Sequence, residues 1–484
     1  MNNTFRIVIV GAGFAGVGIA MQLQRAGWGD FRILEKGADV GGTWRENTYP
    51  GAACDIPSHL YSYSFEPNPD WSSQFSPQPE IYRYLQHCAR KHGLYDKTWF
   101  NCEVAEARFD EGACRWRITT VSGEVMEAEY LIAATGQLNK PAYPPVPGIK
   151  SFRGLSFHSA CWDHQADLAG KRVAVVGNGA SAIQLVPPVA QQAAELTLFQ
   201  RSANWILPRR ARDYSSTWRT RFRRRPWLRW LYRAKLFLER DLRFNRIQRQ
   251  GNMNRKLANQ ARGYLAAVID DLELRLKLTP EYPLGCKRVL ISDDYYPALR
   301  RDNVRVNDKG VKAVTPDGVV DGNGEKTEVD AIIYATGFQS HDFLFPIAVY
   351  GEGGRALKEE WQDGARAYMG MAVAGFPNLF VLYGPNTNLG HNSIIFMLEC
   401  QFRYIIRCLC HCQRQGLRRM AVSALAQQRY DRQLQEGFQG STWAGNCNSW
   451  YKAANGRIIN NWTGRAWSYW WLTRKPRYRD YEFQ

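Results

Sequence analysis

The stretch that decides the fold is Phe5–Gly16, which reads FRIVIVGAGFAG. Its first half, Phe5–Val10, is apolar and β-branched, which is typical of a buried parallel strand. The second half matches the GxGxxG pattern of a dinucleotide-binding loop through Gly11, Gly13 and Gly16. Such glycines permit a tight turn, let the backbone approach a pyrophosphate and let the next helix pack on the strand. We therefore expect a dinucleotide at this loop.

The residues that follow complete a strand–loop–helix–strand unit. Val17–Gln24 predicts a helix, and Phe31–Leu34 predicts a second strand that ends at Glu35. A carboxylate about twenty residues after the loop accepts hydrogen bonds from the hydroxyl groups of a ribose. The complete unit favours a dinucleotide with a free ribose over a glycine turn without a ligand.

A second unit repeats this pattern in the middle of the chain. Val173–Val176 predicts a strand, and Leu196–Phe199 predicts the next one. The loop between the first of these strands and its helix consists of Gly177, Asn178, Gly179, Ala180, Ser181 and Ala182. The second strand leads to Arg201 and Ser202, and a guanidinium pairs with a 2′-phosphate that a carboxylate would repel. This site should therefore prefer NADPH over NADH, and FAD is the natural electron-transfer partner at the first site.

Further strands indicate how the two units are connected. Tyr130–Gly136 and Ala331–Phe338 are apolar and end in Ala-Thr-Gly, while Asn378–Pro385 precedes a helix expected at Ile394–Cys408. We predict an α/β fold with two Rossmann-like dinucleotide-binding domains, one for FAD and one for NADPH, and a helical insertion. The expected segments are 1–140 and 375–484 for the discontinuous FAD domain, 141–170 for an interdomain linker, 171–212 and 281–374 for the NADPH domain, and 213–280 for a basic helical insertion.

Composition restricts the class of protein. The 484 residues are 45% hydrophobic and 13% aromatic, which suits a globular chain of about three domains, or two with insertions. No apolar run approaches the roughly 20 residues of a membrane span, and the N-terminus lacks the pattern of a secretory signal. Eleven cysteines show no disulfide framework, so we expect a cytoplasmic protein. The tightest cluster, Cys408–Cys412 (CLCHC), lacks two separated CxxC pairs, which favours ordinary thiols over a metal site.

The formal charge of +18 is concentrated between Arg209 and Arg262. Within that segment, one helical stripe contains Trp227, Leu231, Ala234, Leu238 and Leu242. A basic, aromatic helix of this kind can contact an anionic membrane. The alternative, which we favour, is a helix whose apolar stripe packs on a domain and whose basic face is solvated. Nucleic-acid binding is not expected, because no recognised motif accompanies the charge.

Three further patterns resemble those of a known family. FRGLSFHSACWD matches the fingerprint FxGxxxHxxxW followed by Pro or Asp, through Phe152, Gly154, His158, Trp162 and Asp163. GGxWxxxxYPGxxxD is matched by Gly41, Gly42, Trp44, Tyr49, Pro50, Gly51 and Asp55. A KR pair followed by YY is matched by Lys287, Arg288, Tyr295 and Tyr296. With these patterns the chain resembles class B flavoprotein monooxygenases, and most closely type I Baeyer–Villiger monooxygenases.

The resemblance implies a FAD- and NADPH-dependent enzyme that inserts one oxygen atom of O2 next to a ketone carbonyl, through a C4a-peroxyflavin, and forms an ester or lactone. Arg288 matches the family arginine that stabilises the anionic peroxide, with Lys287 beside it, and Asp55 matches the carboxylate that positions this arginine. Further cofactor contacts carried over from the family are Gly42, Thr43, Trp44, Tyr61 and Val104 at FAD, Ala53 and Cys54 near the nicotinamide, and Trp450 in a C-terminal loop over NADP. In the family the fingerprint braces the two domains, and His158 does not perform the chemistry.

Other classes remain as alternatives. An N- or S-oxygenating flavin-containing monooxygenase is the main one, because the protonated form of the same flavin species oxidises heteroatoms. A disulfide reductase would need a CxxxxC pair, and Cys54 has no partner at that spacing. A non-catalytic, membrane-docked flavoprotein is remote, because Arg201, Arg288 and Asp55 are intact. The expected partners are O2 and a small ketone or heteroatom substrate, whose identity is left open, as is the oligomeric state.

Overall fold

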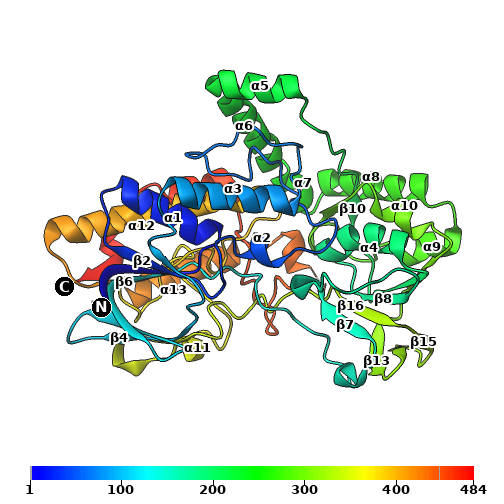
Figure 1. Ribbon diagram of the computed structural model, residues 1–484. Helices are drawn as coiled ribbons and strands as arrows, with labels where there is room; N and C mark the ends of the chain where they lie inside the picture. The colour runs from blue at the N-terminus through cyan, green and yellow to red at the C-terminus, as the bar shows by residue number, and fades with distance from the viewer. Residues whose placement is uncertain (1–2, 446, 448) are drawn as a thin grey trace.

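Two sheets, the first mixed and the second parallel, lie side by side along the molecule and carry the two glycine-rich loops (Figure 1). The computed structural model describes residues 3–445, 447 and 449–484. The first sheet contains, in spatial order, β17 (Ala348–Tyr350), β4 (Val104–Asp110), β5 (Arg115–Thr120), β6 (Val125–Ala133), β1 (Thr4–Val10), β2 (Phe31–Leu34) and β3 (Thr98–Trp99), with β18 (Leu379–Val381) also paired to β6. Strand β1 is parallel to both β2 and β6, so the first glycine loop leaves the centre of the sheet.

Helices pack on the first sheet, whose central strand β1 is buried along most of its length. The helices of this part are α1 (Phe14–Arg25), α2 (Thr43–Glu46), α3 (Gln78–Lys91), α11 (Leu357–Glu360), α12 (Ile394–Gln415), α13 (Ala424–Glu436) and α14 (Ala466–Thr473). Helix α1 packs against α3 and α12, and this layer buries Ile7 and Ile9 of β1 together with Phe402 of α12. A short antiparallel pair, β19 (Met420–Val422) and β20 (Tyr481–Phe483), fixes the C-terminus.

The second sheet is smaller and entirely parallel. Its spatial order is β12 (Val304–Asn307), β9 (Glu195–Phe199), β8 (Arg172–Val176), β16 (Ala331–Tyr334) and β7 (Leu155–His158). Around it lie α4 (Ala180–Gln192), α10 (Tyr295–Leu299), the pair β10 (Ile206–Leu207) and β11 (Leu290–Ile291), and the antiparallel β13 (Val311–Thr315), β14 (Gly318–Asp321) and β15 (Lys326–Glu328). The expected α/β fold with two dinucleotide-binding units is confirmed.

Some segments lie elsewhere than the sequence predicted. Strand β17 joins the first sheet, so the chain returns there before residue 375, where the second segment of the FAD domain was expected to begin. Strand β7 carries part of the fingerprint and pairs with β16 at the edge of the second sheet, so 141–170 is more than a linker. Both are short edge strands, which give a weak sequence signal. Helix α12 extends beyond the expected Cys408 to Gln415, where Gly416 caps it with a φ of 67°.

The helical insertion contains α5 (Ser216–Arg224), α6 (Pro226–Asp241), α7 (Phe244–Ile247), α8 (Asn252–Val268) and α9 (Leu272–Lys277). Helices α5 and α6 project from the body at the top of Figure 1. The expected packing of the apolar stripe is wrong, because Trp227 and Leu238 are exposed while Arg233 points inward. The Arg233 guanidinium donates to the His59 carbonyl oxygen at 2.6 Å, a contact that the sequence pattern does not reveal. No helix among the described residues is long and apolar enough to cross a bilayer.

Candidate active site

The first glycine loop has the geometry that its sequence predicts. Gly11 has a φ of 104°, and a Cβ atom there would lie 2.6 Å from the Ala134 carbonyl oxygen. Gly13 has no such backbone obstruction, because a Cβ atom added there would meet nothing closer than the Gly42 Cα, at 3.6 Å. The Glu35 carboxylate accepts hydrogen bonds from the Ala12 amide at 2.8 Å and from the Gly37 amide at 2.9 Å. It thereby fixes the turn of the loop and faces the cavity described below.

The second glycine loop repeats this arrangement at the end of β8. Gly177 also has a φ of 104°, and its amide donates to the Phe199 carbonyl oxygen at 2.9 Å. Ser202 follows the end of β9, and its hydroxyl accepts a hydrogen bond from the Lys287 ammonium at 2.7 Å. Burial and the nearby Arg201 charge lower the pKa of Lys287. Two cations, Arg201 and Lys287, together with the Ser202 hydroxyl, therefore lie where a 2′-phosphate is expected.

An ion pair between the two domains lies in the wall of the cavity. Arg288 Nη2 and Nε donate to the same Asp55 oxygen, at 2.5 and 3.2 Å, and the side chains expose 30% and 27% of their surface. Burial acts to raise the pKa of Asp55, but the charge and hydrogen bonds of Arg288 outweigh it, so this pKa lies below its ordinary value. The Asp55 carboxylate raises the pKa of Arg288. Both groups are therefore charged throughout the neutral range.

A continuous cavity of about 660 Å³ connects the two glycine loops and the ion pair. The predicted residues that line it are Gly11, Gly13, Glu35, Gly42, Thr43, Trp44, Ala53, Cys54, Asp55, Tyr61, Val104, Asn178, Gly179, Ala180, Ser181, Lys287, Arg288 and Trp450. Gly16, Gly177, Ala182, Arg201 and Ser202 lie outside its lining. The size is typical of a cofactor and ligand site. The cavity therefore brings both predicted dinucleotide sites and the predicted catalytic pair together.

Gln184 of α4 is a site residue that the sequence analysis missed. Its amide nitrogen donates to the Ala53 carbonyl oxygen at 2.9 Å, and its amide oxygen accepts from the Tyr49 hydroxyl at 3.0 Å. The segment from Tyr49 to Asp55 is thus fixed to the second domain. No motif marks Gln184, because only the fold places α4 beside this segment. Burial raises the pKa of the adjacent Cys54 thiol, which is consistent with a neutral wall group.

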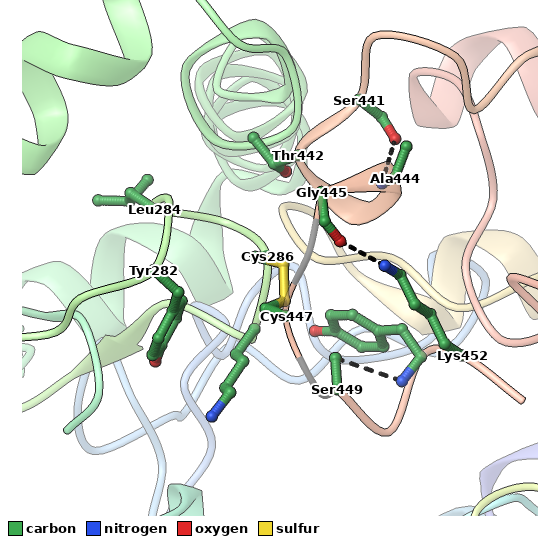
Figure 2. Close-up of a disulfide and its surroundings, with 12 residues drawn as sticks. Tyr282, Leu284, Cys286, Ser441, Thr442, Ala444, Gly445, Cys447, Ser449 and Lys452 are labelled. Carbon is green, nitrogen blue, oxygen red and sulfur yellow. Dashed lines mark hydrogen bonds between the residues drawn. A yellow bond between two sulfur atoms is a disulfide. The ribbon is translucent and has the colours of Figure 1, made fainter. Parts of the chain in front are cut away.

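The C-terminal loop reaches the cavity through Trp450, whose carbonyl oxygen lies 2.7 Å from both His341 Nε2 and Asn460 Nδ2. A disulfide between Cys286 and Cys447 links this loop to the residue before Lys287 (Figure 2). The expectation of no disulfide is wrong for this pair, and the other nine cysteines are free. The two residues are 161 positions apart, so their spacing gave no signal.

The fingerprint residues lie outside the cavity lining. His158 is fully buried, burial lowers its pKa, and its Nδ1 accepts from the Ala160 amide at 3.1 Å. The Trp162 ring packs edge-on against Phe157 at 5.0 Å, and a side chain at Gly154 would collide with the Asp330 carbonyl oxygen. Phe152 packs in the small core beneath β16, and Asp163 accepts from the Gln165 amide at 2.9 Å. These contacts are structural.

The cysteine cluster of α12 is buried at Cys408 and Cys412, and Cys412 Sγ lies 3.8 Å from the Met420 sulfur. Within the part of the chain that the structure describes, no group of three or more His, Cys, Asp or Glu side chains is placed to hold a metal ion. The thiols pack as apolar groups in the core between α12 and the first sheet.

Comparisons with known proteins agree with this geometry. The family model described as pyridine nucleotide-disulphide oxidoreductase matches residues 8–261. A protein of Pseudomonas aeruginosa named Baeyer-Villiger monooxygenase is 45% identical over 475 residues, which cover 97% of this chain and 90% of that one. A protein of Streptomyces coelicolor with the same name is 41% identical over 479 residues, which cover 99% and 92%. The solved OTEMO complex with FAD and NADP has a TM-score of 0.90 at 28% identity and covers 100% of both chains.

Proposed function

The chain belongs to the Baeyer–Villiger monooxygenases, and from this premise we propose that it oxygenates a ketone to an ester or lactone at the cavity wall formed by Asp55 and Arg288. The reaction consumes the ketone, O2, NADPH and a proton and yields the ester, NADP⁺ and water. The observation that carries the proposal is the Arg288–Asp55 pair, which lies in the cavity that joins both glycine loops.

The enzyme uses FAD and NADPH. We propose that the first loop and Glu35 hold FAD, because Gly13 has no side chain to keep a pyrophosphate from the backbone and Glu35 faces the cavity. The second loop with Arg201 and Lys287 would hold NADPH. When bound, NADPH supplies a hydride and FAD supplies the activation of O2. The separate positions of the two loops along one cavity fit this pair of dinucleotides.

Arg288 provides a permanent positive charge in this site. As the new carbon–oxygen bond forms, the carbonyl oxygen of the ketone gains negative charge. A guanidinium cannot lose its proton, so it stabilises this charge at any pH at which the protein is folded. Asp55 does not react. It holds the guanidinium in place through the hydrogen bonds to Nη2 and Nε, which leaves the other amino group of the fork free for substrate or nicotinamide.

The surrounding side chains exclude water from the reacting atoms. Trp44 donates from its indole nitrogen to the Tyr61 hydroxyl at 3.2 Å, and Cys54 is buried beside Asp55. Trp450 of the C-terminal loop lines the cavity. Removing water strengthens the interaction between Arg288 and a developing charge.

The scarcity of disulfides, with nine of eleven cysteines free, supports the cytoplasmic location that we propose.

The test is product analysis with purified, FAD-loaded enzyme. It is mixed with NADPH and ¹⁸O2 in the presence of linear, cyclic and aryl ketones, with methyl phenyl sulfide and a tertiary amine as heteroatom probes. We expect an ester or lactone that carries one labelled oxygen atom, detected by mass spectrometry. A sulfoxide or N-oxide without an ester from any ketone would contradict the proposal and favour the heteroatom-oxygenating alternative.

A further inference from the structure

Helix α6 is fixed to the body by polar contacts on its inner face. Arg233 donates to the His59 carbonyl oxygen at 2.6 Å and lies 3.9 Å from Glu399. At the end of the helix, the buried Asp241 accepts from the Ala466 amide at 2.8 Å and contacts His391 at 3.4 Å. Breaking these contacts would leave charged groups buried without partners, which is costly. The helix therefore cannot rotate about its axis to bury a different face.

The outer face of α6 is consequently apolar. Trp227 and Trp230 expose 60% and 67% of their surface, and Leu231, Leu238 and Leu242 are exposed as well. These positions recur at intervals of three, four and seven residues, so they form one stripe along the helix. The polarity of an ordinary surface helix is thus inverted, with charges inside and large apolar groups in solvent. Apolar groups gathered in this way mark an interaction surface.

A second set of exposed tryptophans begins at the end of this helix. Helix α14 starts at Ala466, whose amide is bonded to Asp241 of α6, and α14 exposes Trp467, Trp470 and Trp471. The Arg474 guanidinium lies 3.4 Å from the centroid of the Trp471 ring. Exposed aromatic groups are therefore found at both ends of α6.

The charge around these groups is strongly positive. The exposed cations between 214 and 246 are Arg221, Arg223, Arg224, Arg225, Lys235, Arg243 and Arg246. Arg223 pairs with Asp70. The exposed acid of that segment is Glu239, which lies 3.7 Å from Lys235 on the same helix. Tryptophan beside arginine and lysine is typical of helices that lie in the interface of an anionic bilayer, with aromatic rings at the level of the lipid headgroups.

We propose that the outer faces of α5, α6 and α14, with the exposed residues named above, form a docking surface for an anionic lipid bilayer. The surface lies in the membrane interface and does not cross the bilayer. The apolar stripe inserts among the headgroups, and the cations of α5 and α6 pair with lipid phosphates and carboxylates. A protein–protein contact would require complementary acidic groups, and the charge of this surface would make a second copy of the chain repel it. The inference is independent of the reaction that the enzyme catalyses.

The test is cosedimentation of the FAD-loaded enzyme with vesicles. Vesicles of phosphatidylcholine mixed with phosphatidylserine should bind the protein at low salt, release most of it at high salt and bind it far more strongly than phosphatidylcholine alone. The variant with Trp227→Ser, Trp230→Ser and Leu231→Ser should lose at least tenfold in bound fraction. Leu425→Ser, which removes an apolar side chain 71% exposed on α13, is the matched control and should bind as wild type does.

Flavin content and melting temperature show that each variant is folded, and sedimentation velocity gives the mass in solution. Equal binding to both kinds of vesicle, or unchanged binding of the triple variant, would overturn the proposal. So would a wild-type dimer that the triple variant converts to a monomer without any binding of wild type to vesicles, because the stripe would then be an interface between copies.

Discussion

Arg288 and Asp55 meet across the two halves of the molecule through two hydrogen bonds to one carboxylate oxygen, at 2.5 and 3.2 Å. Asp55 belongs to a segment that Gln184 of α4 holds by a hydrogen bond, whereas Arg288 lies two residues before β11. The pair forms only when these segments are both in place. It therefore makes the position of the guanidinium depend on the docking of the two nucleotide-binding units.

Replacing the guanidinium should abolish oxygenation without removing the cofactor. In Arg288→Ala, we expect ester formation to fall by about a hundredfold or more, the scale of losing one fixed group that stabilises developing charge. FAD content should stay at the wild-type level, because the first glycine loop and Glu35, which we propose hold FAD, are fixed by hydrogen bonds that do not involve Arg288. Rates are measured from the ester formed and the NADPH consumed. Ester formation near the wild-type rate would refute the assignment, and Arg288→Lys serves as the charge-conserving control.

The ion pair predicts how stability depends on pH. Because Arg288 holds the pKa of Asp55 below its ordinary 3.8, the stabilisation is present above that value and is lost as pH falls through the lowered folded-state pKa. The difference in melting temperature between wild type and Asp55→Asn should thus be constant from about pH 5 to about pH 8 and should shrink only in stronger acid. A difference that already declines between neutral pH and pH 5 would contradict the depressed pKa.

Arg201 should determine the choice of nicotinamide nucleotide. Arg201→Ala removes a charged contact worth about 1.5–3 kcal/mol, so the ratio of kcat/KM for NADPH over NADH should fall roughly ten- to a hundredfold. Arg305→Ala, on the exposed face of β12, should leave the ratio unchanged. Steady-state kinetics with both nucleotides provide the measurement. A wild-type enzyme that used both equally well would remove the basis for this prediction.

The first two glycines of the first loop, Gly11 and Gly13, should respond differently to alanine. Gly11→Ala places a Cβ 2.6 Å from a carbonyl oxygen at a φ of 104°, so it should destabilise the protein by about 1–2 kcal/mol and prevent FAD binding. Gly13→Ala has no comparable obstruction, so the apoprotein should keep its stability while FAD binding weakens. Denaturant unfolding of the apoprotein and absorbance of bound flavin separate the two effects. Equal destabilisation by both substitutions would be the contrary result.

The disulfide should affect NADPH binding. Cys447→Ser frees the loop that carries Trp450 from the residue beside Lys287, so the KM for NADPH should rise several-fold at unchanged FAD content. Cys161→Ser removes an exposed free thiol and is the control. Titration of the unfolded, unreduced protein should find nine thiols, in agreement with the free cysteines. Eleven thiols would show that the bond is not formed in solution.

Local patterns predicted the parts of the fold that local chemistry determines. Strand β2 has the predicted ends, and the turn at Gly11 has the positive φ that its pattern requires. The pairing of Arg288 with Asp55 was predicted only through the family patterns, because no periodicity connects residues so far apart. Gln184 was missed for the same reason. The stripe of α6 was assigned to the wrong face, since a hydrophobic pattern does not reveal that Arg233 finds its partners inside the protein.

The bond between Cys286 and Cys447 closes the intervening chain into a covalent ring. That ring contains β16, the crossing back to the first sheet and the whole of α12, so it passes through both nucleotide-binding units. A proteolytic cut within it would leave the two fragments attached until a reductant is added. The disulfide would likewise limit how far the two nucleotide-binding units can separate. It ties the chain beside Arg288 to the C-terminal part of the first unit even when their other contacts open.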